Sequence, residues 1–180
     1  MTYKEFLESK IELAQDSGFV VDHAKINKAL KPHQRDAVMW ALKGGRRALF
    51  ESFGLGKTIQ EIEFCHLAAE HCGGRALIVL PLGVKQEFTR DAVEILGYEK
   101  PEYCRTMEEV EQSTSQIVLT NYERVRDGDI RPEYFVATSL DEASVLRSFG
   151  SKTYQTFLDK FKSVPYKLVA TATPSPNKYK

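Results

Sequence analysis

Short apolar runs alternate with amphipathic stretches along most of this 180-residue chain. Runs of strand length are RALFES, RALIVLP, QIVLTN, YFVATSLDEA and YKLVATATP, and the helical patterns between them include KTIQEIEFCHLAAEHC, GVKQEFTRDAVEIL and SKTYQTFLDKFKS. This alternation is typical of a mostly parallel sheet with helices packed on both faces. The pattern therefore predicts an α/β fold.

Two further helices are predicted before the alternating region. TYKEFLESKIELAQDSG has apolar residues at helical spacing and ends at Gly18, a residue type that often caps helices. A second helix should begin at Pro32, which suits the first helical turn, and end at Gly44 and Gly45. We expect a helical extension over residues 1–29 and one domain over residues 30–180.

Composition excludes several classes of protein. Hydrophobic residues make up 42% of the chain and charged residues 28%, which is ordinary for a globular domain. No apolar run approaches the roughly 20 residues that cross a bilayer, and MTYKEFLESK is too charged for a secretion signal, so we expect an intracellular protein without a membrane partner. The formal net charge is zero, so any affinity for nucleic acid must come from a local patch.

The cysteines indicate neither a disulfide framework nor a zinc site. There are three, without a close pair of the CxxC type. Two neighbouring pairs, Cys65 with His66 and His71 with Cys72, offer four potential ligands, but they lie about two helical turns apart, too far for one ion. We expect reduced thiols.

The strongest chemical signal is SFGLGKT, between a predicted strand and a predicted helix. Gly54 and Gly56 allow successive backbone N–H groups to turn around an anion, and the helix N-terminus adds its positive end. Lys57 can then face the β and γ phosphates, and the Thr58 hydroxyl can bind Mg²⁺. A glycine-rich turn with a surface lysine is the alternative, but the strand–loop–helix context favours a nucleotide site. Glu51 stands where the usual motif has its first glycine.

The segment TSLDEASVL contains an acidic pair, Asp141 and Glu142, directly after an apolar run of strand type. Asp141 can hold Mg²⁺ through water, and Glu142 can polarise an attacking water, although such pairs are also found in solvated turns. SFGLGKT, LPLG, TNYE, LDEAS and TATPSPN all follow predicted strands. Because ligands of open parallel sheets bind beyond the carboxyl ends of the strands, we expect one site at that edge.

Six ordered motifs resemble the first RecA-like lobe of superfamily 2 helicases, and most closely the Swi/Snf branch of DNA translocases. They are LKPHQ (30–34), FGLGKTIQ (53–60), LIVLPLGVKQEF (77–88), LTNYE (119–123), LDEAS (140–144) and TATPSPN (171–177). The phosphate loop of that branch resembles DEMGLGKT, whose acidic residue matches Glu51. Ser52 and Phe53 depart from the branch pattern, and Ser144 replaces the histidine of DEAH proteins.

The resemblance implies a role for each matching residue. Nucleotide contacts fall on Gln34, which resembles the glutamine that recognises adenine, and on Phe53, Gly54, Leu55, Gly56, Lys57, Thr58 and Ile59. Catalytic roles fall on Lys57, Asp141 and Glu142, with Thr58 and Asp141 as the Mg²⁺ residues. Thr171 and Thr173 resemble threonines that couple nucleotide to nucleic acid, and Pro81, Thr120, Asn121 and Tyr122 resemble contacts to the backbone of one DNA strand.

The resemblance also implies ATP and Mg²⁺ as cofactors, and duplex DNA bound without sequence preference as a partner. A second RecA-like lobe, which supplies arginine fingers, is absent from this chain, so we expect the isolated lobe to be nearly inactive. The alternative is a stand-alone nucleotide-binding or interaction module with a vestigial ATPase site. Lys57, Thr58, Asp141 and Glu142 together favour the translocase. An adenylate-kinase-like enzyme leaves LKPHQ and TATP unaccounted for.

Overall fold

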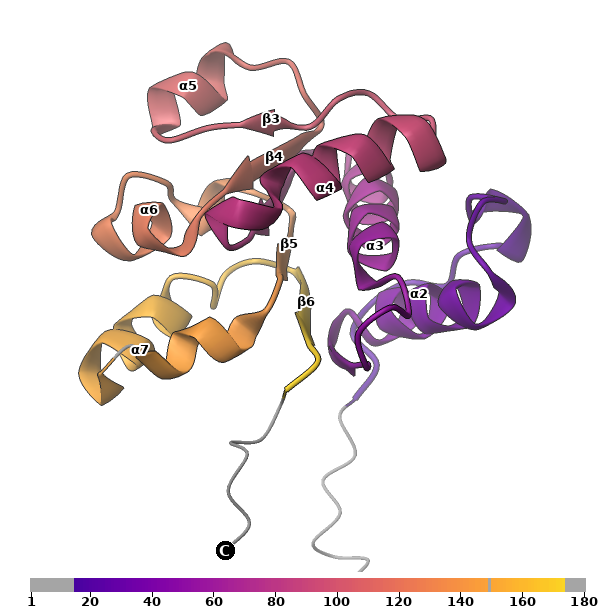
Figure 1. Cartoon of the computed structure of the whole chain (residues 1–180), viewed down its shortest axis with the longest axis horizontal. Helices are drawn as coiled ribbons and strands as arrows, with labels where there is room; N and C mark the ends of the chain where they lie inside the picture. The colour runs from indigo at the N-terminus through magenta and orange to yellow at the C-terminus, as the bar shows by residue number, and fades with distance from the viewer. Residues whose placement is uncertain (1–14, 149, 174–180) are drawn as a thin grey trace, which may run out of the picture.

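Six parallel strands form one sheet in the order β1-β6-β5-β2-β4-β3 (Figure 1). The computed structural model describes residues 15–148 and 150–173. The strands are β1 (Arg46–Phe50), β2 (Ala76–Val79), β3 (Glu102–Tyr103), β4 (Ile117–Thr120), β5 (Ala137–Leu140) and β6 (Tyr166–Thr171). Every residue of β2, β4 and β5 is buried, as expected for parallel strands covered on both faces. The predicted fold class is confirmed.

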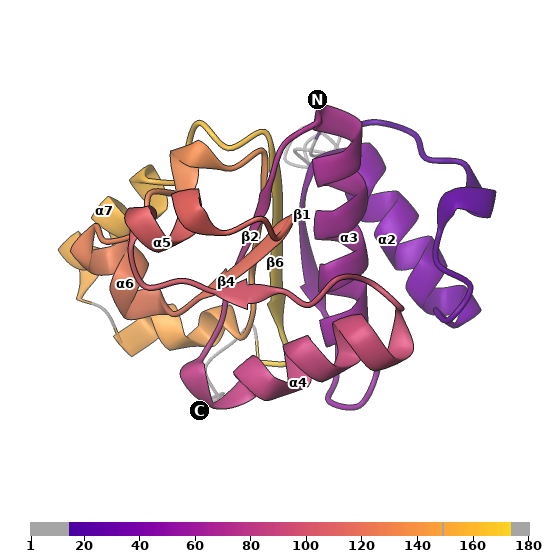
Figure 2. The ribbon, with the colours of Figure 1, turned by 90° about the horizontal axis from the view of Figure 1, so that it is seen from above.

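Helices cover both faces of the sheet (Figure 2). One face carries α2 (Pro32–Gly44), α3 (Lys57–Cys72) and α4 (Lys85–Arg90), and the other carries α5 (Met107–Gln112), α6 (Tyr122–Asp127) and α7 (Ser151–Asp159). Successive residues of a strand point to opposite faces, so the core has two parts. In β2, Ile78 belongs to the cluster around α3, whereas Leu77 and Val79 belong to the cluster with α6 and α7.

The five predicted strands are observed as β1, β2, β4, β5 and β6, and the two longest helices also agree with the sequence pattern. The observed α2 and α3 begin and end where the pattern predicts, at Pro32 and at Lys57–Cys72. β3, α5 and α6 are not predicted, because none of these short segments contains a continuous apolar run or a full helical repeat.

The predicted helix over residues 83–96 is divided into three parts. A 3-10 turn (Leu82–Val84) precedes α4, and a π-helical turn (Asp91–Ile95) follows it. The wider turn closes where the N–H of Leu96 donates to the Asp91 carbonyl at 3.0 Å. The extra residue in this turn shifts the helical faces, which breaks the regular helical spacing.

The segment before α2 packs onto the domain. The N–H groups of Ser17, Gly18 and Phe19 donate to the carbonyls of Gly44, Lys43 and Leu42, at 3.2, 3.0 and 3.0 Å. These bonds satisfy carbonyls that the end of a helix leaves without partners. Most of the predicted N-terminal helix lies outside the described residues, and residues 15–18 are not helical.

Residues 19–30 contribute to the core of the domain. They contain a 3-10 turn (His23–Lys25), and the side chains of Val21, Ile26 and Leu30 are buried in the cluster around α3. The described part of the predicted extension therefore packs as part of the domain.

Gly18→Ala tests this docking. A Cβ at Gly18 would lie 1.8 Å from the Leu42 carbonyl oxygen, so the segment must move away from α2. We expect a loss of about 1–3 kcal/mol in the free energy of unfolding, measured by thermal or urea denaturation. Gly83→Ala is the matched control, because its Cβ would meet nothing within 4 Å. Equal stability of the two variants would contradict the docking.

Candidate nucleotide site

The strand order brings three loops together at the carboxyl edge of the sheet. β6 lies between β1 and β5, with Thr171 paired to Phe50 in β1 and Val169 paired to Leu140 in β5. The loop SFGLGKT (residues 52–58), called the phosphate loop below, follows β1, and the acidic pair Asp141 and Glu142 follows β5. Thr171 is the last residue of β6. Segments that are about 120 residues apart in the chain therefore meet at one site, as the sequence predicts.

The glycines of the phosphate loop adopt the backbone conformation that their type permits. Gly54 has φ of 83° and Gly56 has φ of 77°, both in the region that L side chains rarely adopt. A Cβ at Gly56 would also lie 2.4 Å from Nε2 of Gln34, whereas a Cβ at Gly54 would meet nothing within 4 Å. The backbone conformation at Gly56 thus favours glycine, and a side chain there would also displace the Gln34 amide. The neighbouring Phe53 side chain is 77% exposed.

Gln34 supports the loop from α2. Its side chain is buried, and its Oε1 accepts a hydrogen bond from the N–H of Lys31 at 2.8 Å. Its Nε2 donates to the Leu55 carbonyl, also at 2.8 Å. The amide keeps capacity for one more bond at each end, so adenine recognition stays a prediction beside the support of the loop.

Lys57 is the first residue of α3 and bends back over the loop. Its ammonium donates to the carbonyls of Glu51 at 3.0 Å and Ser52 at 3.3 Å, and it lies 5.3 Å from the centre of the Phe53 ring. Phosphate oxygens can replace these acceptors without a change in the fold.

Thr58 has an acidic neighbour that the sequence did not indicate. Its hydroxyl contacts Oε1 of Glu87, an exposed residue of α4, at 3.3 Å. The hydroxyl predicted to bind Mg²⁺ therefore has a carboxylate beside it. Thr58, Asp141 and Glu87 are all oxygen donors, the type that Mg²⁺ prefers.

The backbone of Asp141 is fixed from two sides. Its N–H donates to the Val79 carbonyl at 2.9 Å, and its carbonyl accepts from the Tyr122 hydroxyl at 2.6 Å. The next residue, Glu142, has φ of 47°, the one positive φ at a non-glycine residue among those described. Such conformations cost energy and persist where the surrounding contacts impose them.

Three hydroxyl groups converge on one carboxylate oxygen of Glu142. Oε1 accepts from Ser144, from Thr171 at 3.0 Å and from Thr173 at 3.3 Å. Partial burial raises the pKa of Glu142, but these hydrogen bonds, with one from the backbone of Ala172, outweigh that effect and hold the pKa below its usual range. Glu142 is ionised at neutral pH. The two predicted coupling threonines are in direct contact with it, and their coupling role stays a prediction.

Glu61 is a buried carboxyl that sequence reasoning missed. It lies on α3, one turn after Lys57, and its Oε2 accepts from the Ser139 hydroxyl at 2.6 Å. Its Oε1 has no N–H or O–H partner among the described residues, and the Asp141 carboxyl lies within hydrogen-bonding reach of the side chain. The available signal was an acid on the apolar face of a helix, because glutamate is seldom buried without a partner.

Burial raises the pKa of both acids. Loss of solvent, together with the negative charge of Asp141, raises the pKa of Glu61 well above its usual value. Loss of solvent also raises the pKa of Asp141 to about 6, and the charge of Glu142 acts in the same direction. Glu142 and Asp141 are adjacent in the chain, but their pKa values shift in opposite directions.

Of the four predicted nucleic-acid contacts, two have buried side chains. The Thr120 hydroxyl donates to the Cys104 carbonyl at 2.8 Å, and Tyr122 is the buried donor to Asp141. As whole residues, Thr120 and Tyr122 are 0% and 1% exposed, and their contact with nucleic acid stays a prediction. Pro81 and Asn121 are partly exposed at the same edge of the sheet.

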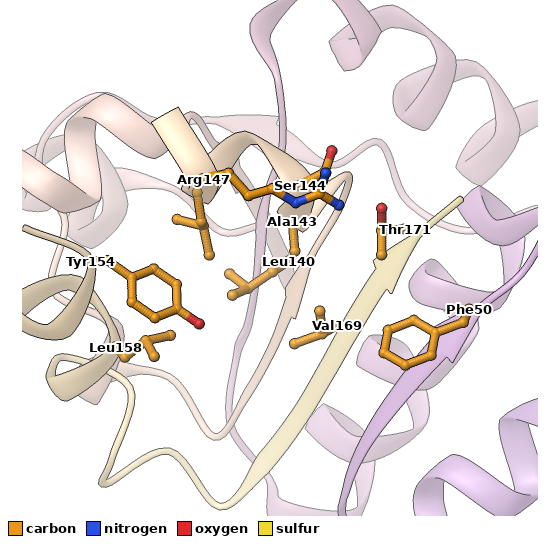
Figure 3. A pocket seen from close by; sticks show the side chains of 10 residues that line it. Phe50, Leu140, Ala143, Ser144, Arg147, Tyr154, Leu158, Val169 and Thr171 are labelled. Carbon is orange, nitrogen blue, oxygen red and sulfur yellow. The ribbon is translucent and has the colours of Figure 1, made fainter. Parts of the chain in front are cut away.

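A cavity of about 520 Å³ opens beside the acidic pair, on the α7 face (Figure 3). Its walls are mainly apolar and include Leu140, Leu158 and Val169, with Arg147 and Tyr154 among its polar residues. Ser144 and Thr171, which both donate to Glu142, also line it. The sequence pattern gave no sign of this cavity.

The sheet order and the loops at its carboxyl edge define a RecA-like α/β lobe. Among similar solved structures are two of the UvsW helicase of bacteriophage T4 and the SWI2/SNF2 ATPase core of Sulfolobus solfataricus in complex with dsDNA. The first UvsW structure has a TM-score of 0.68 and 16% sequence identity, and the match covers 99% of the present chain and 63% of the UvsW chain. The SWI2/SNF2 core has a TM-score of 0.67 and 20% sequence identity, and the match covers 89% of the present chain and 35% of the SWI2/SNF2 chain. The second UvsW structure has a TM-score of 0.67 and 16% sequence identity, and the match covers 96% of the present chain and 35% of the UvsW chain.

These similarities establish the fold. The chain matches only part of each neighbour, in agreement with the prediction of a single RecA-like lobe. No family model matches the sequence, and no curated protein matches it. In the described part of the chain, no helix is long and apolar enough to cross a membrane.

Glu61→Gln tests the buried acid. Because the pKa of Glu61 is raised in the folded protein, Glu61 binds a proton on folding over the pH range between its unfolded and folded pKa, which costs stability there. Glutamine keeps an acceptor for Ser139 and is always neutral. The variant should be the more stable protein at neutral pH. A carboxyl whose pKa is raised by folding makes wild type less stable as the pH rises and more stable as the pH falls. The stability advantage of Glu61→Gln over wild type should therefore shrink as the pH falls towards 5, by up to about 1.4 kcal/mol per pH unit.

Thermal unfolding between about pH 5 and pH 8 measures this difference. Glu133→Gln, at an exposed position, is the control and should show no such dependence. A constant difference between Glu61→Gln and wild type over this pH range would show that Glu61 titrates like a surface glutamate.

Proposed function

We propose that this chain is the first RecA-like lobe of an ATP-dependent DNA translocase or helicase, which hydrolyses ATP once a second lobe completes the site. The observation that carries this proposal is the convergence of the phosphate loop, the acidic pair and the threonines at three adjacent strand ends. The helicase-type fold of the neighbours supports it.

The phosphates of ATP fit the loop between β1 and α3. Gly54 and Gly56 leave the backbone free to turn its N–H groups toward an anion, and α3 adds the positive end of its dipole. Lys57 exchanges its two carbonyl partners for phosphate oxygens. Gln34 holds the loop and contacts adenine with its remaining amide capacity.

Mg²⁺ fits the oxygen donors beside the loop. Thr58 and Asp141 are the residues that hold it, with Glu87 beside the threonine hydroxyl. When bound, the ion neutralises charge on the phosphates. Burial raises the pKa of Asp141 to about 6, and the positive charge of Lys57 partly offsets this effect.

Glu142 orients the water that attacks the terminal phosphate. Three hydroxyl groups fix one of its carboxylate oxygens and keep the group ionised. The same contacts attach Glu142 to the end of β6, so a movement of Thr171 and Thr173 alters the position of the carboxylate. The arginines that stabilise charge in the transition state come from the second lobe.

Duplex DNA binds at the same edge of the sheet, beyond β2 and β4. Pro81 and Asn121 present main-chain and amide groups there, and such contacts to phosphates read geometry without sequence. The SWI2/SNF2 core among the neighbours is in complex with dsDNA, which supports this partner.

Lys57→Ala tests the nucleotide site in this lobe. The variant loses the charge that faces the phosphates, so we expect binding of MgATP, measured by calorimetry at up to millimolar nucleotide, to weaken at least about 10-fold. The melting temperature should stay near that of wild type, because Lys57 bonds only two loop carbonyls. Lys43→Ala, on the surface, is the control. If Lys57→Ala unfolds, the lysine has a structural role instead.

Glu142→Gln tests hydrolysis, in the presence of a second RecA-like lobe and duplex DNA. The amide keeps the size of the side chain but lacks the carboxylate charge, so ATP hydrolysis should fall by roughly 10²–10⁴-fold while nucleotide binding persists. Glu133→Gln should leave the rate unchanged. Unaltered hydrolysis in Glu142→Gln would remove this residue from the mechanism, and no hydrolysis even in wild type would favour a stand-alone nucleotide-binding module.

A further inference from the structure

Gln60 is a fully buried polar residue to which the predicted site gives no role. Its Nε2 lies near three acceptors, which are Oε2 of Glu51 at 2.8 Å and the carbonyls of Gly56 at 3.3 Å and Leu55 at 3.4 Å. A reversed amide would place Oε1 against these acceptors, so the network fixes its orientation. Oε1 itself has no hydrogen-bond partner among the described residues.

The Leu55 carbonyl is held between two glutamines. Nε2 of Gln34 donates to it from α2, and Nε2 of Gln60 donates to it from α3. In a planar trans peptide the C=O and the following N–H point in opposite directions. A carbonyl of Leu55 that is held inward therefore turns the N–H of Gly56 outward, toward the position of a bound anion.

Glu51 connects this arrangement to the start of the loop. Its carboxylate accepts from Gln60, and its carbonyl accepts from the ammonium of Lys57. Both contacts are with residues in the first turn of α3, so the start of the loop is held against the helix that begins where the loop ends. A glycine in place of Glu51 lacks the carboxylate that receives the Gln60 amide.

We propose that Glu51 and Gln60 are positioning residues that orient the Leu55–Gly56 peptide for phosphate binding. Neither side chain touches the phosphate, and both act through the backbone of the loop. The inference rests on the proposed nucleotide-binding function of the same loop, and it assigns a role to the glutamate that replaces the usual first glycine.

Gln60→Glu is the decisive variant in the full chain. It removes the amide donor and places a carboxylate against Glu51 and two carbonyls, so binding of pyrophosphate and of MgATP should weaken at least about 10-fold. Glu51→Gln retains an acceptor for the Gln60 amide and should bind within about 3-fold of wild type, whereas Glu51→Ala should lie between the two. Gln155→Glu, exposed on α7, controls for the added charge.

The Gly56 amide gives a readout that does not need nucleotide. Its NMR resonance and hydrogen-exchange rate should change in Gln60→Glu and Glu51→Ala, whereas Glu51→Gln and the amides of β2 should match wild type. An unchanged Gly56 amide in Gln60→Glu, or unaltered affinity in that variant, overturns the inference.

Failure of the inference can be told apart from failure of the proposed function. If wild type binds neither pyrophosphate nor MgATP, the proposed function fails, and the Gly56 amide still decides whether the two residues orient the loop. If Gln60→Glu does not fold, Glu51→Ala against Glu51→Gln decides the same question, because Glu51 is only partly buried. Equal behaviour of these two variants overturns the inference.

Discussion

The insertion of β6 between β1 and β5 is the constraint on which the site depends. The last described strand pairs with the first along five residues and with β5 along four. All three strands run in the same direction, so their following loops emerge at one edge. The phosphate loop, the acidic pair and Thr171 are adjacent only because this pairing forms. A chain in which β1 and β6 separated would keep each motif and lose the site.

Helix α3 joins the phosphate loop to the acidic pair. Its first residue is Lys57, and its buried face then presents Gln60 to the loop and Glu61 to Asp141. A helix turns once in 3.6 residues, so side chains three and four positions after the lysine point back under the loop. The same helix carries the lysine proposed to face the phosphates and the glutamine that holds the Leu55 carbonyl.

The two acids at the end of β5 show how local environment gives similar groups different pKa values. Asp141 is buried beside Glu61 and has a raised pKa, whereas Glu142 receives three hydroxyl groups and has a lowered one. Tyr122 extends this arrangement toward β4, because its hydroxyl holds the Asp141 carbonyl. The loop proposed to meet DNA is therefore in direct contact with the acidic pair.

The local elements and the residue types of the site follow from the sequence pattern alone. Proline and glycine mark the ends of α2, the periodicity of α3 is long enough to be unambiguous, and GLGKT has a backbone chemistry that few other roles require. The strand order and the burial of polar side chains depend on contacts that form only in the folded chain. Glu61, Gln60 and Tyr122 belong to the site because each finds a partner contributed by another segment of the chain. A local pattern cannot specify such partners, since hydrogen bonds and pKa shifts in the interior depend on contacts between residues far apart in sequence.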